Sequence, residues 1–363
     1  MKPDPHNRFY RFFSWSRTRE ESGTGSGTGS GKHHGVQSSA NPPTAAIRKT
    51  SAWFLPRFFE VAAKAFKFLR NSAEFAAVYA LLILVRVIPM AGIRVLARVI
   101  ARVAFLLLRR RRHIAVENIQ LALDLPSDRA LEIARQSLLG FAMTALPEVA
   151  KLRRSLIAKH ASGWLQANYP GAVPLFVQAR QLHDEYGGCV FVTPHLGNWE
   201  LLPYAAAVNG INLAVLIRRL DNPMLEDLLD RHRRATGQHF VSRRNGLLSL
   251  KNHLARGRSV AILPDQSTVG GLTVDFFGRP ATTTPLPALL AVRHQRPIVV
   301  VACLRSAQHG FIGHVGEPIL PRDTDDERPE IERLTRLMTA DLEQLIRRYP
   351  EQYLWMHDRW KTY

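Results

Sequence analysis

Short apolar runs separated by helical stretches characterise the chain beyond about residue 185. The runs are rich in β-branched residues and cover residues 188–193, 213–217, 259–263 and 297–304, with residues 310–319 as a further candidate. Continuous hydrophobicity, without alternation, is typical of strands that are buried on both faces. Such strands, alternating with helices, predict an α/β fold with a central mixed sheet covered by helices on both faces.

A helical region precedes these strands. The pattern over residues 114–165 predicts a helix at 115–123, a turn at Leu125-Pro126 and a further helix for which Ser127 is a good N-cap residue. The α/β domain is therefore expected to begin with helices, near residue 114.

Two segments upstream of this region predict attachment to a membrane. From residue 51 to about 75, aromatic residues recur at helical spacing among Lys and Arg, a pattern typical of a helix in the lipid headgroup layer. An amphipathic helix packed on the protein's own core is the alternative. Residues 75–93 are apolar over almost the length that crosses a bilayer, but Arg86 and Pro89 interrupt them. We expect an N-terminal helical anchor that embeds in a membrane, with or without crossing it.

The distribution of charge makes an anionic membrane surface the expected partner of this region. Residues 1–113 hold 20 Lys and Arg against 5 Asp and Glu, whereas residues 114–363 hold 29 against 25. Arginines recur every four residues over Arg94–Arg102, and the arginine run at 109–112 favours the cytoplasmic side. A basic and apolar segment fits an anionic lipid surface. No nucleic-acid partner is expected, because the folded domain carries no nucleic-acid-binding motif.

Composition also suggests how the chain is divided. Residues 22–35 are mostly Gly, Ser and Thr, which predicts a disordered basic tail over residues 1–50. Membrane-anchoring helices are then expected over residues 51–113, and one α/β domain over residues 114–363.

The first predicted strand leads directly into His195-Leu-Gly-Asn-Trp-Glu200. In α/β folds, active-site residues lie at the carboxyl ends of strands. Gly197 permits an unusual turn, and Asn198 can cap a helix that begins near Trp199, which puts Glu200 in the first helical turn. From there its carboxylate is expected to reach back to His195 and hold a neutral imidazole base in one tautomer.

The spacing alone fits a structural hydrogen bond as well as a catalytic pair. A zinc site is not expected, because no second His or Cys stands at ligand spacing and His-x4-Glu differs from the His-Glu-x-x-His motif. Cys189 and Cys303 lie far apart in apolar runs, so we expect buried thiols that bind no metal. No metal or bound cofactor is expected.

Several blocks in order along residues 75–363 resemble the bacterial lipid A late acyltransferases, the lauroyl and myristoyl transferases of the wider lysophospholipid acyltransferase group. One similar block is Pro194–Glu200. The others cover residues 112–118, 217–223, 263–266, 274–282 and 350–357. The first of these reads Arg-His-Ile-Ala-Val-Glu-Asn, and the last reads Pro-Glu-Gln-Tyr-Leu-Trp-Met-His. The first 50 residues have no counterpart, and Arg219 stands where the family has proline.

The resemblance implies a reaction and a location. A fatty acyl group would pass from acyl carrier protein, or from coenzyme A, to a hydroxyl of a lipid A precursor, a membrane glycolipid, at the cytoplasmic face of a bacterial inner membrane. His195 would act as the general base, and Glu200 would orient it. Gly197 and Asn198 would shape the loop, where a backbone N–H is a candidate oxyanion donor. The remaining substrate-binding candidates are Arg218 for a phosphate, and Asp265, Gln266, Phe277 and Gly278 for the cleft or an acyl groove.

Two other interpretations remain open. The same chemistry on another glycolipid or on a lysophospholipid would leave the sequence pattern unchanged, and so would an inactive membrane-bound scaffold that retains the fold. Arginines at 231–234 and 243–244 are candidates for receiving an acidic carrier protein, although solvated surface arginines are the more common case.

Overall fold

A computed structural model describes residues 48–155, 161–235, 237–243, 246–306, 308 and 310–361. The tail predicted over residues 1–50 lies outside these residues, except for the last three, which belong to the first described helix.

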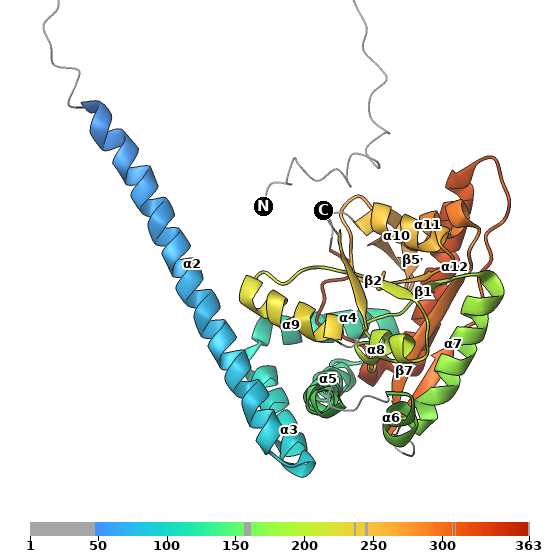
Figure 1. Cartoon of the computed structure of the whole chain (residues 1–363), viewed down its shortest axis with the longest axis horizontal. Helices are drawn as coiled ribbons and strands as arrows, with labels where there is room; N and C mark the ends of the chain where they lie inside the picture. Colours follow the sequence, from blue (N-terminus) through green and yellow to red (C-terminus); the bar gives the residue numbers. More distant parts are fainter. Residues whose placement is uncertain are drawn as a thin grey trace, which may run out of the picture.

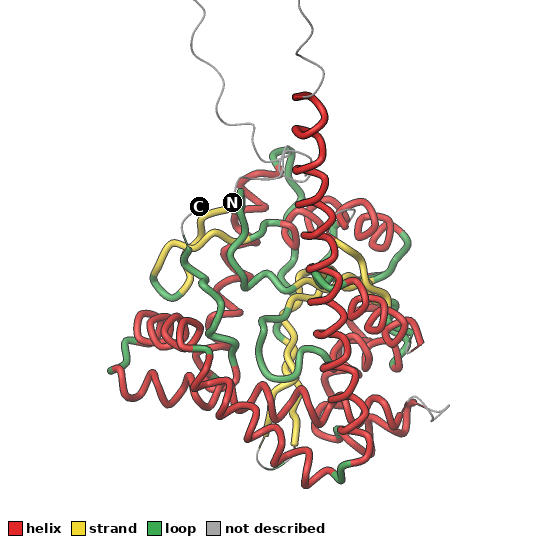
Figure 2. The backbone as a smooth tube through the Cα atoms, turned by 90° about the vertical axis from the view of Figure 1, so that its left-hand side faces the viewer, coloured by secondary structure: helices red, strands yellow, loops and turns green. Residues whose placement is uncertain are grey.

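Six strands form one sheet in the order β3-β2-β4-β1-β7-β8. Neighbouring strands are parallel, except that β8 runs antiparallel to β7 at one edge. Helices surround this mixed sheet (Figure 2), which confirms the predicted α/β fold. The strands are β1 (Val190–Val192), β2 (Leu213–Ile217), β3 (His239–Ser242), β4 (Ser259–Ile262), β7 (Ile298–Ser306) and β8 (Gly310–Val315).

Both faces of the sheet are buried along the central strands β1, β4 and β7, as their continuous apolar runs predict. In β1, Val190 and Val192 belong to a larger core that includes α10, α11 and α12, whereas Phe191 belongs to a second core with α7 and α8. The helices that flank the sheet are α6 (Ala161–Asn168), α7 (Val173–Tyr186), α8 (Leu201–Val208), α9 (Pro223–Ala235), α10 (Gly246–Ala255), α11 (Leu286–His294) and α12 (Glu327–Arg348), with short 3₁₀ helices η1 (Pro170–Ala172) and η3 (Pro350–Gln352).

One long helix contains the first predicted membrane segment and most of the second. Helix α2 (Arg48–Val87) runs along one side of the molecule and extends beyond it (Figure 1). Its segment Ala63–Val85 is long and apolar enough to cross a membrane. Pro89, which was expected to interrupt the anchor, is the N-cap of the next helix, α3 (Met90–Leu107), because proline lacks the N–H that a helix interior requires.

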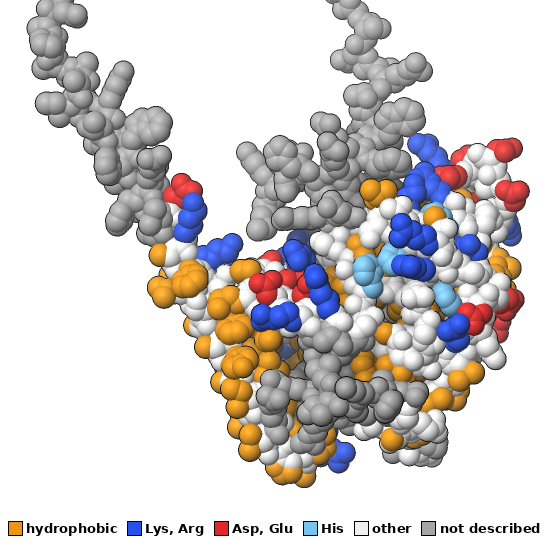
Figure 3. Space-filling model, in the orientation of Figure 1, with side chains coloured by type: hydrophobic (Ala, Val, Ile, Leu, Met, Phe, Trp, Pro, Cys, Tyr) orange, Lys and Arg blue, Asp and Glu red, His pale blue; other side chains and the backbone are white. Residues whose placement is uncertain are grey.

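Helix α3 packs on α5 (Ser127–Ser155) and leaves its other faces open. Small or apolar residues at a spacing of four, namely Ile93, Ala97 and Ala101, make the buried face. The residues that stay exposed are apolar on one side and basic on the other: Val95, Val99, Val103, Leu106 and Leu107, and Arg94, Arg98 and Arg102. Hydrophobic side chains line α2 and α3 together (Figure 3), so both helices present an apolar surface.

Some elements were not predicted. Strand β3 carries only one buried residue, Val241, so its sequence lacks the apolar run by which the other strands were found. A separate antiparallel hairpin joins β5 (Leu272–Phe276) to β6 (Arg279–Thr283). Helix α4 (Arg109–Leu123) begins inside the arginine run, earlier than the expected 115–123.

Candidate active site

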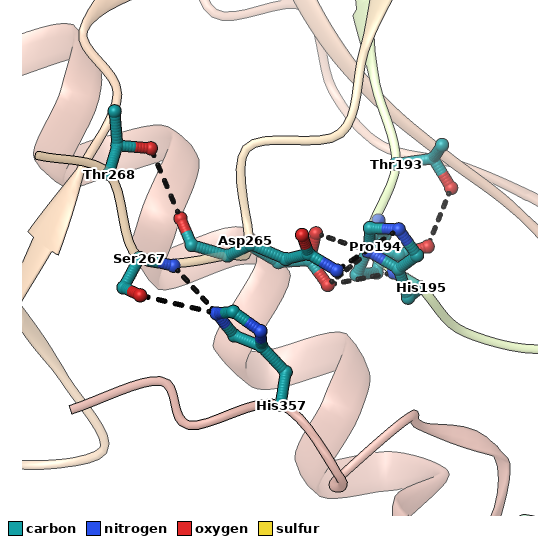
Figure 4. Close-up of polar contacts among 8 residues, drawn as sticks. Thr193, Pro194, His195, Asp265, Ser267, Thr268 and His357 are labelled. Atoms are coloured by element: carbon teal, nitrogen blue, oxygen red, sulfur yellow. Dashed lines mark hydrogen bonds and ion pairs between the residues drawn. The ribbon is translucent and has the colours of Figure 1, made fainter. Parts of the chain in front are cut away.

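His195 lies three residues beyond the end of β1, and one carboxylate fixes its position. Its ring Nδ1 is 2.8 Å from Asp265 Oδ1, and its backbone N–H donates to Asp265 Oδ2 at 2.8 Å (Figure 4). Strands β1 and β4 are parallel neighbours with Val192 opposite Ile262, so the loops that carry His195 and Asp265 leave the sheet side by side. The two bonds hold both the backbone and the ring of His195.

The Asp265 carboxylate is a buried charge with a cationic counterpart. Its side chain is only 1% exposed. Burial raises the pKa of Asp265, but the hydrogen bonds and charge of His195, together with the buried Arg359, outweigh it and lower that pKa below its ordinary value. The carboxylate therefore stays ionised at neutral pH. Burial and this same carboxylate raise the pKa of Tyr353 well above its usual range, so Tyr353 stays neutral.

The arrangement around His195 suits a general base. Because the Nδ1 proton is donated to Asp265, the neutral ring carries its lone pair on Nε2. Burial lowers the pKa of His195, but the charge and hydrogen bond of Asp265 and the charge of Glu200 outweigh it, so the pKa is raised. Gln266 places its Nε2 3.5 Å from the imidazole Nε2, at the reactive edge of the ring.

The carboxylate bonded to the ring differs from the expected one. Glu200 was predicted to hold the imidazole, but the carboxylate on Nδ1 belongs to Asp265, and Glu200 is exposed at the N-cap of α8. The ring of Trp199 meets His195 edge-on instead, with ring centroids 5.3 Å apart, and itself stacks on Phe141 of α5 at 5.6 Å. The charge of Glu200 still contributes to raising the pKa of His195.

The loop after His195 is held by its own backbone amides. Gly197 N–H donates to Gln352 O at 3.1 Å, and Asn198 N–H donates to Cys303 O at 2.7 Å. These amides, which were candidate oxyanion donors, are thus already bonded to protein carbonyl groups. Asn198 Oδ1 also accepts from the N–H of Leu201, the first residue of α8, at 3.2 Å, although the helix begins later than expected and its N-cap is Glu200.

The C-terminal segment, residues 350–361, supports this loop from the other side. Leu354 N–H donates to His195 O at 3.0 Å, and Leu196 forms an isolated β-bridge with Tyr353. Asn118 of α4 in turn donates to the carbonyls of Trp355 and His357 at 2.9 and 2.8 Å. The sequence pattern did not reveal this role, although the Pro-Glu-Gln-Tyr block marked the segment.

A second histidine lies close to the site. His357 Nε2 is 3.1 Å from the backbone N–H of Ser267 and 3.2 Å from its Oγ (Figure 4). Burial lowers the pKa of His357, which keeps the ring neutral and able to accept these bonds. It fixes the loop that follows Asp265 and Gln266.

The other predicted site residues have different surroundings. Arg218, at the end of β2, has a side chain 74% exposed and pairs with Asp221 at 3.4 Å. Phe277 is buried in an aromatic cluster with Trp355 and Trp360, at a turn where its φ is +57°, and Gly278 follows it in the same turn. The structure thus gives Phe277 a packing role and leaves Arg218 open to solvent.

Within the block 217–223, Asn222 joins the α/β domain to α2. It is buried and donates to Asn71 O at 2.8 Å and to Glu74 Oε2 at 3.1 Å, both on α2. Its Oδ1 accepts from Met224 N–H at 3.1 Å and so caps α9.

Both cysteines are buried, as predicted, and burial raises the pKa of Cys189 to about 12.

Comparison with known proteins places the chain in a family. A profile described as bacterial lipid A biosynthesis acyltransferase matches residues 62–362, which include most of α2, the His195 loop and the C-terminal segment. Lipid A biosynthesis acyltransferase 2 of Shigella flexneri is 24% identical over 175 residues, or 48% of this chain and 55% of that protein. The match thus spans about half the length of this curated relative. With a family match over most of its length, the chain belongs to the bacterial lipid A biosynthesis acyltransferases.

Proposed function

We propose that this protein transfers a fatty acyl group from a carrier thioester to a hydroxyl of a lipid A precursor. The observation that carries the proposal is the His195–Asp265 pair, which leaves imidazole Nε2 as a base at the edge of the site, in a chain of this family. The proposed donor is acyl carrier protein or acyl-CoA, and the proposed location is the cytoplasmic face of the inner membrane.

In the proposed reaction, His195 Nε2 takes the proton of the acceptor hydroxyl as its oxygen attacks the thioester carbonyl. Asp265 holds the Nδ1 proton and stabilises the imidazolium that forms. Glu200 adds stabilisation through its charge, from the solvent side. Collapse of the tetrahedral intermediate breaks the carbon–sulfur bond, and the departing thiolate takes the proton from the imidazolium.

Basic residues near the site suit anionic substrates. Arg243 is close enough to act on the pKa of His195, and Arg233 of α9 lies within electrostatic reach of Glu200. Phosphate groups of the lipid acceptor, or an acidic carrier protein, would find cationic partners here. Arg218, exposed after the end of β2, is a further candidate for such a contact.

The apolar surface of α2 and α3 supports membrane attachment. Arg94, Arg98 and Arg102 are exposed on α3 next to its apolar side, where they would meet anionic headgroups. Attachment of this kind would bring a lipid acceptor to an active site whose domain is joined to α2 through Asn222.

A small apolar cavity offers a place for the acyl chain. It has a volume of about 50 Å³, reaches Thr193 and Trp199 beside the base, and continues between α7, α8 and the sheet to Ala206 and Ile211. A long acyl chain needs more room than this, so we expect the cavity to widen when the chain enters.

Filling the far part of this cavity is expected to shift the preferred chain length. Ala206→Leu adds three carbons there and removes room for about two methylene groups of the acyl chain. Because burying each methylene group contributes about 0.8 kcal/mol, the variant should favour shorter donors by about tenfold. Competition between two acyl donors of different length measures the ratio. Ala207→Leu, on the same helix but outside the cavity, is the control; equal ratios in both variants would contradict this placement of the chain.

The experiment that tests the function uses the full chain in detergent with acyl carrier protein or CoA thioesters. Mass spectrometry of the product is expected to show one added acyl chain on a lipid A precursor, and none with His195→Gln. Transfer only to another glycolipid or a lysophospholipid would support the alternative acceptor. Absence of transfer to any of them would support an inactive scaffold instead.

A further inference from the structure

A cavity of about 460 Å³ lies at the amino-terminal ends of the strands, whereas His195 follows a carboxyl-terminal end. Its walls include the residues where β2 and β3 begin, Leu213 and His239, together with Arg258 immediately before β4. His195 follows the carboxyl end of β1, which is parallel to β4, so the cavity and the active site belong to opposite ends of the strands. The cavity does not reach His195, although its wall shares Pro203, Ile211 and Leu213 with the small apolar cavity proposed for the acyl chain.

The side chains that line this cavity are cationic or neutral. Four of them can carry positive charge, namely His239, His253, Arg256 and Arg258, and no Asp or Glu is among the described residues of the lining. Figure 3 shows histidine side chains beside Lys and Arg side chains on the face that carries α8 and α10. Arg256 and Arg258 give the hollow a positive potential that favours an anion.

One ring nitrogen in this wall is buried without a hydrogen-bond partner among the described residues. The rings of His239 and His253 are 4.7 Å apart, and His253 Nδ1 is buried with no hydrogen-bond partner in the described parts of the chain. Burial, followed by the charges of His239, Arg258 and Arg256, lowers the pKa of His253. A buried polar atom is rarely left without a partner in a folded protein.

We propose that this cavity binds a soluble organic phosphate. Phosphate oxygens accept charge-assisted hydrogen bonds from arginine and histidine, the groups that this wall provides. The volume exceeds what a phosphate ion fills and falls in the range of small-molecule sites, roughly 300 to 1,000 Å³. The neutral polar residues Gln238, Ser249 and Asn252 line the remaining space and are suited to hydroxyl or base groups of the organic part.

Isothermal titration of the full chain in detergent tests the proposal with three probes: inorganic phosphate, adenosine monophosphate and glucose 1-phosphate. At least one organic phosphate is expected to bind at least tenfold more tightly than inorganic phosphate. Arg256→Gln with Arg258→Gln should weaken that binding at least tenfold. Arg129→Gln, which removes an exposed charge from α5, should leave it unchanged. His195→Gln should also leave it unchanged, which separates this site from the active site.

Histidine ring resonances in NMR spectra give a second measure that does not depend on the arginine variants. Those of His239 and His253 are expected to shift during the titration. Absence of saturable binding, unshifted rings, or equal weakening by Arg129→Gln would overturn the site. Inorganic phosphate that binds as tightly as both organic probes would overturn the assignment of an organic ligand.

Discussion

Asp265→Asn is expected to lower kcat by about 10²- to 10⁴-fold, as much as loss of the base itself through His195→Gln. The amide of asparagine can donate to Nδ1, which would leave the imidazole proton on Nε2, the atom that must accept a proton from the hydroxyl. Glu200→Gln should cost about tenfold or less, because an exposed carboxylate acts through solvent-screened charge.

The pH dependence separates the two carboxylates further. Catalysis needs neutral His195, so kcat rises with pH through the pKa of that ring, which Asp265 and Glu200 raise. Removing either charge lowers this pKa, so the half-maximal point should move to lower pH. The larger move is expected in Asp265→Asn, because Asp265 adds a hydrogen bond to its charge.

Single-turnover rates from pH 5 to 9 measure both effects, and circular dichroism checks that each variant is folded. A larger loss and a larger pH shift in Glu200→Gln than in Asp265→Asn would contradict the assignment. It would mean that Glu200 turns onto the ring when substrate is bound, as the sequence spacing predicts.

The position of the base could be found from local sequence, but its partner could not. His195 follows an apolar strand directly, so its place at a strand end depends on neighbouring residues only. Asp265 and Gln266 also end a strand, and the sequence placed them at the same cleft. That Asp265 rather than Glu200 contacts the ring depends on β1 and β4 being neighbours, although about 70 residues separate them. Periodicity carries no information about such pairing.

The same limit applies to the elements that were missed. Strand β3 is a half-exposed edge strand, and the C-terminal segment has no regular pattern, so neither has a periodicity to detect. The bonds from Gln352 and Leu354 to the His195 loop cross more than 150 positions of sequence. Buried parallel strands are the easiest elements to predict from sequence, because their continuous hydrophobicity follows directly from burial on both faces.

Gly197→Ala is expected to destabilise the protein strongly and to reduce its activity. Gly197 has φ +62°, and a Cβ there would lie 2.1 Å from Cys303 O, a backbone atom that cannot move without shifting β7. The cost of the conformation and of the overlap together should be about 3 kcal/mol or more. Displacing the loop would also misplace His195, so activity should fall about 10²-fold in the molecules that fold.

Two other glycines separate the causes of this effect. Gly278 has φ +71° but open space around its Cβ position, so Gly278→Ala should cost only about 1 kcal/mol. Gly163 in α6 has neither a positive φ nor a close neighbour, and its replacement by Ala should be neutral or stabilising. Thermal unfolding of the three variants should therefore rank Gly197→Ala far below Gly278→Ala. If Gly197→Ala and Gly278→Ala lost the same stability, the conformation alone would explain both, and the close contact of the loop with β7 could not be what holds His195 in place.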